Sequence, residues 1–214
     1  MPRCPRCRKR PAKRSCPALR TKICAVCCAR ERMIELPCPE SCPYLIEARS
    51  ITSTREWELL RKDNADDLRV LQLTDRAFLA LDGIQRSIVD AQRGIGSIPF
   101  RDMNDADVLA AVEIAIKNLE TEESGLIYEH RSGSPRISEL SRQIRAGVDN
   151  VANKFPLEQR PRSVDVLKAL TFLRISAQAH IKHASDDPES ARSFVRYLTL
   201  GYPWPEQETT PLII

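Results

Sequence analysis

The position of the cysteines constrains this chain more than any other feature. All eight lie within the first 42 of its 214 residues, with the spacing C-x2-C-x8-C-x7-C-x2-C-C-x9-C-x3-C. The same segment contains no aromatic residue before Tyr44. So short a segment cannot bury a hydrophobic core large enough to fold unaided. Cross-links must therefore hold it together, either as disulfides or through metal ions.

The flanking sequence favours reduced thiols. The basic N-terminus leads into no apolar segment of the signal-peptide type, and no apolar run approaches the ~20 residues that span a bilayer. We therefore expect a cytoplasmic chain without a membrane span, in which a disulfide framework is disfavoured. A redox-active C-x2-C is disfavoured too, since thioredoxin-like motifs occur in a βαβ context.

Zinc is the metal that best fits the spacing. Cys4–Cys7 and Cys24–Cys27 are C-x2-C turns, which converge two thiolates on one ion, while Cys38 and Cys42 are one residue further apart and Cys16 stands alone. Eight thiolates make two tetrahedral sites. We predict two Zn²⁺ ions as cofactors, and we expect the segment to be unfolded without them.

The adjacent cysteines Cys27 and Cys28 indicate how the ligands divide. Neighbouring side chains point apart on a turn or helix, so each zinc should take one of the two, although which takes which stays open. The predicted first site is Cys4, Cys7, Cys24 and Cys27. The predicted second site is Cys16, Cys28, Cys38 and Cys42. The two sites are then interleaved along the sequence.

This order of ligands resembles the interleaved zinc fingers of the HIT and MYND type, small treble-clef-like modules that usually mediate protein contacts. The resemblance covers residues 4–42. Those families place a Cys near Leu19 and a His near Cys38, so the resemblance implies that Cys28 and Cys38 take those two places. The pattern ICAVCCARERMIELPCPESCPYL with a later GLIYEH also resembles a group of uncharacterised bacterial proteins, which implies no function.

The rest of the chain predicts helices, because apolar residues recur at three- and four-residue steps. The expected helices cover residues 44–93 with a break near 51–54, then about 104–124, 135–151 and 163–183, and a short one opened by Asp187-Pro188 and ending at Gly201. The predicted fold is an all-α helical bundle of roughly five helices that carries a small N-terminal two-zinc, treble-clef-like module. Its boundaries are 1–43 for the zinc module, 44–201 for the bundle and 202–214 for a Pro-rich tail. Trp204 is expected to pack on the bundle or to dock in a partner's groove.

Two functions fit the cysteine segment. In the first, it is a protein-interaction module whose apolar residues exceed what a small zinc core can bury: Leu19, Ile23, Val26, Met33, Ile34 and Leu36. In the second, its basic residues bind the phosphates of RNA or DNA: Arg3, Arg6, Arg8, Lys9, Arg10, Lys13, Arg14, Arg20 and Lys22. Residues 1–42 carry eleven Lys and Arg against three Glu. Part of this positive charge offsets the thiolates of the metal sites themselves.

A third possibility is a metalloenzyme in the helical body. His180 and His183 are three residues apart on one predicted helix, a spacing that suits a shared metal, and Glu113, Glu120 and Glu129 are carboxylates that could join them. The role of the third histidine, His130, stays open. The chain lacks the paired E-x-x-H elements of di-iron bundles, and it has no nucleophile elbow, P-loop or dinucleotide fingerprint. We therefore expect no enzyme.

Overall fold

The computed structural model describes residues 2–96, 99–185 and 192–204, which belong to two compact units. The cysteine unit comprises the chain up to Ser50 and the segment that starts at Leu200; the helical unit is Ile51–Thr199. These divisions differ from the boundaries expected after residues 43 and 201. Helix α2 (Pro43–Leu71) begins in the cysteine unit and continues into the helical unit. Most of the tail expected at 202–214 lies outside the described residues.

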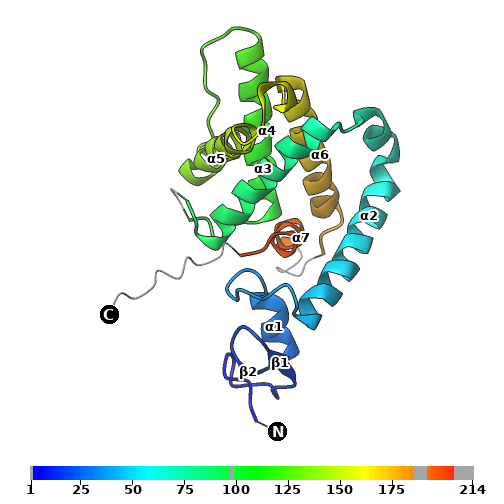
Figure 1. Cartoon of the computed structure of the whole chain (residues 1–214), viewed down its shortest axis with the longest axis vertical. Coiled ribbons are helices and arrows are strands. Elements are labelled where there is room, and N and C mark those ends of the chain that lie inside the picture. The colour runs from blue at the N-terminus through cyan, green and yellow to red at the C-terminus, as the bar shows by residue number, and fades with distance from the viewer. Residues whose placement is uncertain (1, 97–98, 186–191, 205–214) are drawn as a thin grey trace. The chain divides into compact units, whose positions relative to one another are not determined.

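The cysteine unit begins with a β-hairpin that the spacing of the cysteines did not predict. Strands β1 (Arg14–Cys16) and β2 (Thr21–Ile23) pair antiparallel, and helix α1 (Ala25–Glu31) follows directly, as Figure 1 shows. Cys24 caps this helix, because its Sγ accepts a hydrogen bond from the Cys27 amide at 3.4 Å. One cysteine thus ends the hairpin and starts the helix.

The segment after Leu200 completes the cysteine unit. Buried Met33, Cys42 and Leu45 form a small core against which Leu200 and Trp204 pack. The Trp204 indole N–H donates to the carbonyl oxygen of Leu36 at 3.1 Å. Trp204 thus packs within its own chain, as one of the two expected roles has it, but its neighbours belong to the cysteine unit rather than to the helical unit. A part-buried indole needs an acceptor for its N–H, and the chain after α1 supplies one here.

The helical unit contains six α-helices rather than five in its described part. After α2 come α3 (Asp75–Arg93), α4 (Asp105–Glu123), α5 (Pro135–Ala152), the 3-10 turn η1 (Leu157–Gln159), α6 (Ser163–Lys182) and α7 (Ser193–Gly201). The expected break at 51–54 does not occur, since β-branched residues cost a helix little. Helix α2 is instead kinked at Asn64, whose φ of −133° is not helical, and it ends at Leu71. Thr74 Oγ1 then caps α3 by accepting from the Ala77 amide at 3.1 Å.

Other predicted helix ends agree with the structure. Asn104 caps α4 in a reciprocal capping box with Asp107, and Pro135 opens α5. Gly94 ends α3 with φ of 79°, a left-handed conformation that favours glycine. The predicted cap at Asp187-Pro188 lies outside the described residues.

The core of the helical unit lies between two pairs of helices. Helices α3 and α4 each pack against both α5 and α6 (Figure 1). Fully buried side chains from all four fill the space between them, including Ile84, Val112, Leu140 and Leu173. No helix in the described part of the chain is both long and apolar enough to cross a membrane.

The backbones of α3 and α5 approach closely at Gly83 and Gly147. A Cβ atom on Gly83 would lie 2.5 Å from the carbonyl oxygen of Gly147. We expect Gly83→Ala to lower the free energy of unfolding by about 1–3 kcal/mol in urea denaturation followed by circular dichroism, because the helices must move apart. Gly133→Ala is the control, since a Cβ there meets no atom within 4 Å. A more stable Gly83→Ala protein, as helix propensity alone predicts, would contradict the close approach.

Candidate metal centre

Four cysteines of the cysteine unit gather around one point. The Sγ atoms of Cys4, Cys7, Cys24 and Cys27 all lie within 4.8 Å of one another. Zinc–sulfur bonds of about 2.3 Å in a tetrahedron place neighbouring sulfurs about 3.8 Å apart. The Cys7 and Cys24 sulfurs are 3.9 Å apart, and none of the four forms a disulfide. These are the four residues predicted for the first site, and their arrangement suits a tetrahedral metal ion.

Backbone N–H groups aim at two of these sulfurs. The amides of Lys9 and Arg10 lower the pKa of the Cys7 thiol to about 6. Burial alone would raise the pKa of Cys4, but amides including those of Cys24 and Cys7 outweigh burial and lower it. The Cys4–Cys7 turn therefore favours thiolates, the form that binds metal.

Cys27 shows the opposite shift. Burial, together with the sulfurs of Cys24, Cys7 and Cys4, raises its pKa. Several thiolates this close repel one another, and a divalent cation at their centre would offset that repulsion. The donor set of four sulfurs with little solvent exposure fits a structural zinc ion rather than a hard cation such as Mg²⁺.

The other four cysteines lie in the same unit but are less tightly grouped. Cys16, Cys28 and Cys42 are buried, and Cys38 packs against the small cores that contain them. Burial, with the thiolate charges of Cys42, Cys16 and Cys28, raises the pKa of Cys38. Among the described residues, however, the only group of three or more metal-ligand side chains gathered around a point is the one containing Cys4.

Arg6 and Arg14, two of the basic residues predicted to contact nucleic acid, contact side chains of the same unit. Arg6 Nε donates to Glu31 at 2.5 Å and its Nη2 to Glu35 at 2.9 Å, which ties the first cysteine turn to the end of α1. Arg14 lies over the Tyr44 ring, and its guanidinium is 3.7 Å from Cys28 Sγ. Their spacing in the sequence could not reveal these partners. The remaining seven are solvent-exposed: Arg3, Arg8, Lys9, Arg10, Lys13, Arg20 and Lys22.

The apolar residues predicted to form a partner surface fall into a buried group and an exposed group. Ile23, Met33 and Leu36 are buried within the cysteine unit, so the prediction is wrong for these three. Ile23 and Leu36 are buried among the cysteines, whereas Met33 lies in the small core against which Leu200 and Trp204 pack. Val26 on α1 is 39% exposed, and Leu19 and Ile34 are partly exposed.

The histidines do not converge on one point. His180 Nε2 lies 2.5 Å from Glu56 Oε2, and its Nδ1 lies 2.6 Å from Ser193 Oγ. His183 contacts a different carboxylate, Asp63, while His130 contacts Thr121 Oγ1 at 3.0 Å. The carboxylates proposed as fellow ligands, Glu113, Glu120 and Glu129, belong to none of these contacts. No group of three potential metal ligands occurs around a histidine within the residues described.

His180 belongs instead to a buried polar network that sequence reasoning missed. Ser193 Oγ also donates to Asp105 at 3.3 Å, and Asp105 accepts the Phe194 and Val195 amides at 3.1 and 3.0 Å. Asp105, at the start of α4, thereby caps the N-terminus of α7. The network joins α2, α4, α6 and α7 across long stretches of sequence, and no local pattern signals it.

The ion pair of Asp63 should make stability depend on acid pH. Its contacts with His183 and Lys182 lower the pKa of Asp63. A carboxylate with a lowered folded pKa stabilises the fold above its ordinary pKa of about 3.9 and loses that contribution as the pH falls through the folded value. We expect Asp63→Asn to be less stable than the wild type near pH 6. The difference should shrink from about pH 4 downward in urea titrations, whereas Asp66→Asn, whose side chain is 92% exposed, should show little difference at any pH.

Comparison with known proteins gives one partial match. The chain is 30% identical over 105 residues to the mouse transmembrane and coiled-coil domain-containing protein 5B, a stretch that is 48% of this chain and 32% of that protein. This chain therefore covers about a third of the relative's length. No family model matches, and no solved structure matches.

Proposed function

We propose that this protein is a zinc-binding interaction protein, in which structural zinc ions hold a small treble-clef-like module on a helical body. The observation that carries the proposal is the gathering of four free sulfurs within 4.8 Å of one another. The treble-clef-like part of the proposal is supported by the hairpin followed by α1, with a cysteine at their junction. Zinc here contributes to folding, and the exposed surface of the module contacts a partner protein.

The second zinc ion of the proposal would be held by Cys16, Cys28, Cys38 and Cys42. Its support is the burial of three of these residues and the electrostatic effect of the other three on Cys38. The guanidinium groups of Arg14 and Arg32, 3.7 and 3.8 Å from Cys28 Sγ, would offset part of the negative charge of a four-thiolate site.

Native mass spectrometry tests the metal. We expect two zinc ions per chain in the wild type and one in Cys38→Ser, which removes only a ligand of the second site. Ala25→Ser, a substitution at an exposed position beside Cys24, should keep both. A chain that carries no zinc while its thiols remain reduced would contradict the proposal.

A substitution at the exposed Val26 tests whether this surface contacts a partner protein. We expect cross-linking in cells to join the wild-type module to a specific protein whose yield survives nuclease treatment and falls at least tenfold in Val26→Asp. The control is Ala29→Asp, which makes the same change of charge at an exposed position one turn further along α1 and should leave the yield unchanged. Equal cross-linking by the wild type and Val26→Asp would exclude this surface.

The seven exposed basic residues favour a second candidate function, binding to the backbone of RNA or DNA. The cysteine unit offers no exposed aromatic side chain for stacking within its first 42 residues, so such binding would be led by phosphate contacts and would weaken steeply with salt. Fluorescence anisotropy with a mixed-sequence oligonucleotide at two salt concentrations measures this. Replacing Arg8, Lys9 and Arg10 by glutamine should reduce the salt dependence, whereas Arg6→Gln should not, because Arg6 is already paired. Binding that salt does not weaken would exclude this function.

A further inference from the structure

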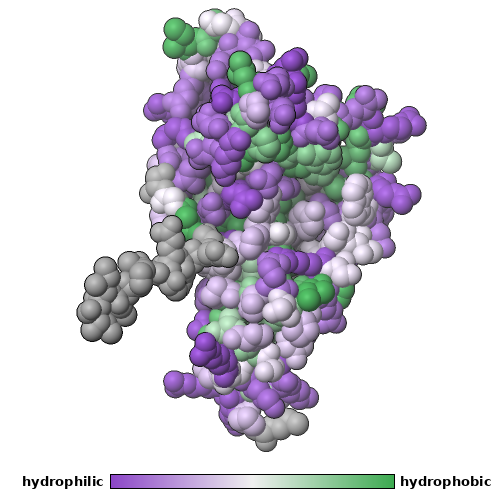
Figure 2. Space-filling model, viewed as in Figure 1, coloured by the Kyte–Doolittle hydropathy of each residue, from purple (hydrophilic) through white to green (hydrophobic). Residues whose placement is uncertain are grey.

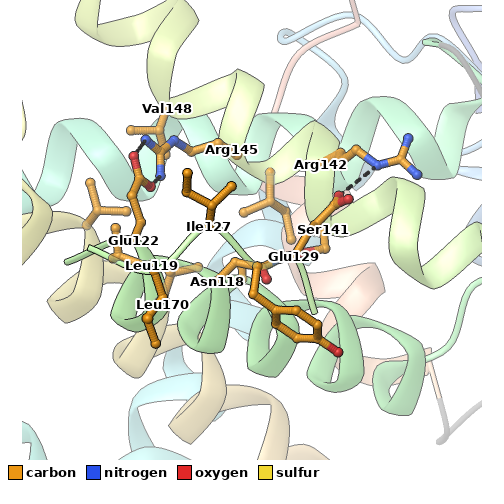
Figure 3. A pocket seen from close by; sticks show the side chains of 15 residues that line it. Asn118, Leu119, Glu122, Ile127, Glu129, Ser141, Arg142, Arg145, Val148 and Leu170 are labelled. Atoms are coloured by element: carbon orange, nitrogen blue, oxygen red, sulfur yellow. Dashed lines mark hydrogen bonds and ion pairs between the residues drawn. The ribbon is translucent and has the colours of Figure 1, made fainter. Parts of the chain in front are cut away.

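A cavity of about 510 Å³ lies in the helical unit, far along the sequence from the cysteines. Helices α4, α5 and α6 and the connection between α4 and α5 surround it (Figure 3). Its lining is mainly apolar and includes Leu119, Ile144, Val148, Val166 and Leu170. This volume falls within the range of about 300–1,000 Å³ that small-molecule sites occupy.

The α4–α5 connection is fixed beside this cavity by Asn118. The Asn118 side chain accepts from the His130 amide at 2.6 Å and donates to the His130 carbonyl oxygen at 3.3 Å. His130 is further held through its ring by Thr121. The side-chain amide of Asn118, an uncharged polar group of the lining, is therefore occupied by the protein's own backbone.

Three consecutive large side chains of this connection remain in solvent although an apolar cavity adjoins them. Leu126 is 65% exposed, Tyr128 67%, and Ile127 is as exposed as in an extended chain, at 105%. Figure 2 shows hydrophobic groups at the end of the helical unit that carries this connection. The folded protein does not bury the Ile127 side chain. An apolar molecule in the cavity could therefore remove from water an apolar surface that the protein itself leaves exposed.

The charges at the cavity are paired with one another. Arg145 binds Glu122 at 2.7 Å, and Arg142 lies 3.4 Å from Glu129, with Ile127 between the two pairs in Figure 3. The contact with Glu122 raises the pKa of Arg145. Arg131, together with a smaller effect of Arg142, lowers the pKa of Glu129. A charged ligand would have to separate a pair to find its own counter-ion. The paired charges that line the cavity therefore favour an uncharged ligand.

We propose that this cavity is a binding site for an uncharged small molecule with a hydrocarbon body, which Ile127 covers. The apolar walls of α4, α5 and α6 contact the hydrocarbon, and the two ion pairs exclude charged analogues. This site is independent of the zinc sites and of the protein partner proposed above.

Calorimetric titration of the full-length protein with 1-decanol, decanoate and decylammonium tests the proposal. We expect 1-decanol to bind at least tenfold more tightly than either ion. Ile127→Ser should weaken its binding about tenfold through the lost apolar contact. Leu157→Ser is the matched control, since Leu157 is 79% exposed on η1 and does not line the cavity. Neither substitution removes a buried group, so both proteins should fold as the wild type does.

A further variant tests the role of the ion pairs. Glu122→Gln leaves Arg145 without its nearest carboxylate, so decanoate should bind more tightly to this variant than to the wild type, and 1-decanol equally well. The proposal is overturned if 1-decanol does not bind, if Ile127→Ser binds it as tightly as the wild type, or if either ion is preferred by the wild type. It also fails if Glu122→Gln leaves the binding of decanoate unchanged.

Discussion

EDTA is expected to unfold the cysteine unit, by removing the zinc proposed above, while the helices of the helical unit persist. A structural zinc site contributes on the order of 10 kcal/mol to folding, and the cysteine unit has only small cores to replace that contribution. The helical unit has its own core between four helices and needs no metal ligand for it. Circular dichroism should therefore change little, because most helical residues belong to the helical unit.

Trp204 can report on the cysteine unit by itself. The chain has two tryptophans, and Trp57 lies in the helical unit. In a Trp57→Phe background, loss of zinc should shift the Trp204 emission to the red as its contacts with Met33 and the Leu36 carbonyl oxygen are lost. Cys24→Ser should produce the same shift without chelator, and Ala25→Ser should not. Unchanged emission from a protein shown to be free of zinc would refute a folding role for the metal.

Loss of the His180 imidazole is expected to destabilise the helical unit far more than the loss of an exposed ion pair does. Glu56 is 5% exposed, and its Oε2 is held by His180, while its Oε1 has no hydrogen-bond partner among the described residues. His180→Ala would leave this carboxylate buried without its partner, at a cost of about 3–5 kcal/mol. Urea denaturation monitored by circular dichroism measures the loss.

His183→Ala is the matched control for this effect, since His183 lies three residues after His180, at the C-cap of α6. Its side chain is 30% exposed and pairs with Asp63, so its loss should cost no more than about 1 kcal/mol. Adding Glu56→Leu to His180→Ala should recover much of the stability, because the double variant leaves no carboxylate buried alone. If the two alanine variants lose the same stability, the buried network has no special energetic role.

The parts of the structure that sequence could predict are those set by neighbouring residues. A C-x2-C turn brings two thiolates together whatever follows it, so the members of the first cysteine group were predictable from spacing. Asn104 and Pro135 start helices for equally local reasons, the capping of free amides and a fixed φ angle.

The parts that sequence could not predict depend on residues distant along the chain. The side chain of Asp105 caps a helix that begins at Ser193, and this interaction requires the completed fold. Arg6 and Arg14 looked like free positive charges because their partners Glu31, Glu35 and Tyr44 become neighbours only after folding. Burial of Met33 likewise depends on Trp204.

The packing of Trp204 on the segment after α1 has a consequence for how the chain is divided in experiments. The cysteine unit is a discontinuous domain, and the helical unit is an insertion between its two pieces. A fragment cut at residue 43 or 50 would keep all eight cysteines yet lose the indole that covers Met33. Such a fragment is a poor substitute for the intact module, and a transplantable version needs residues 200–204 joined to it through a short linker.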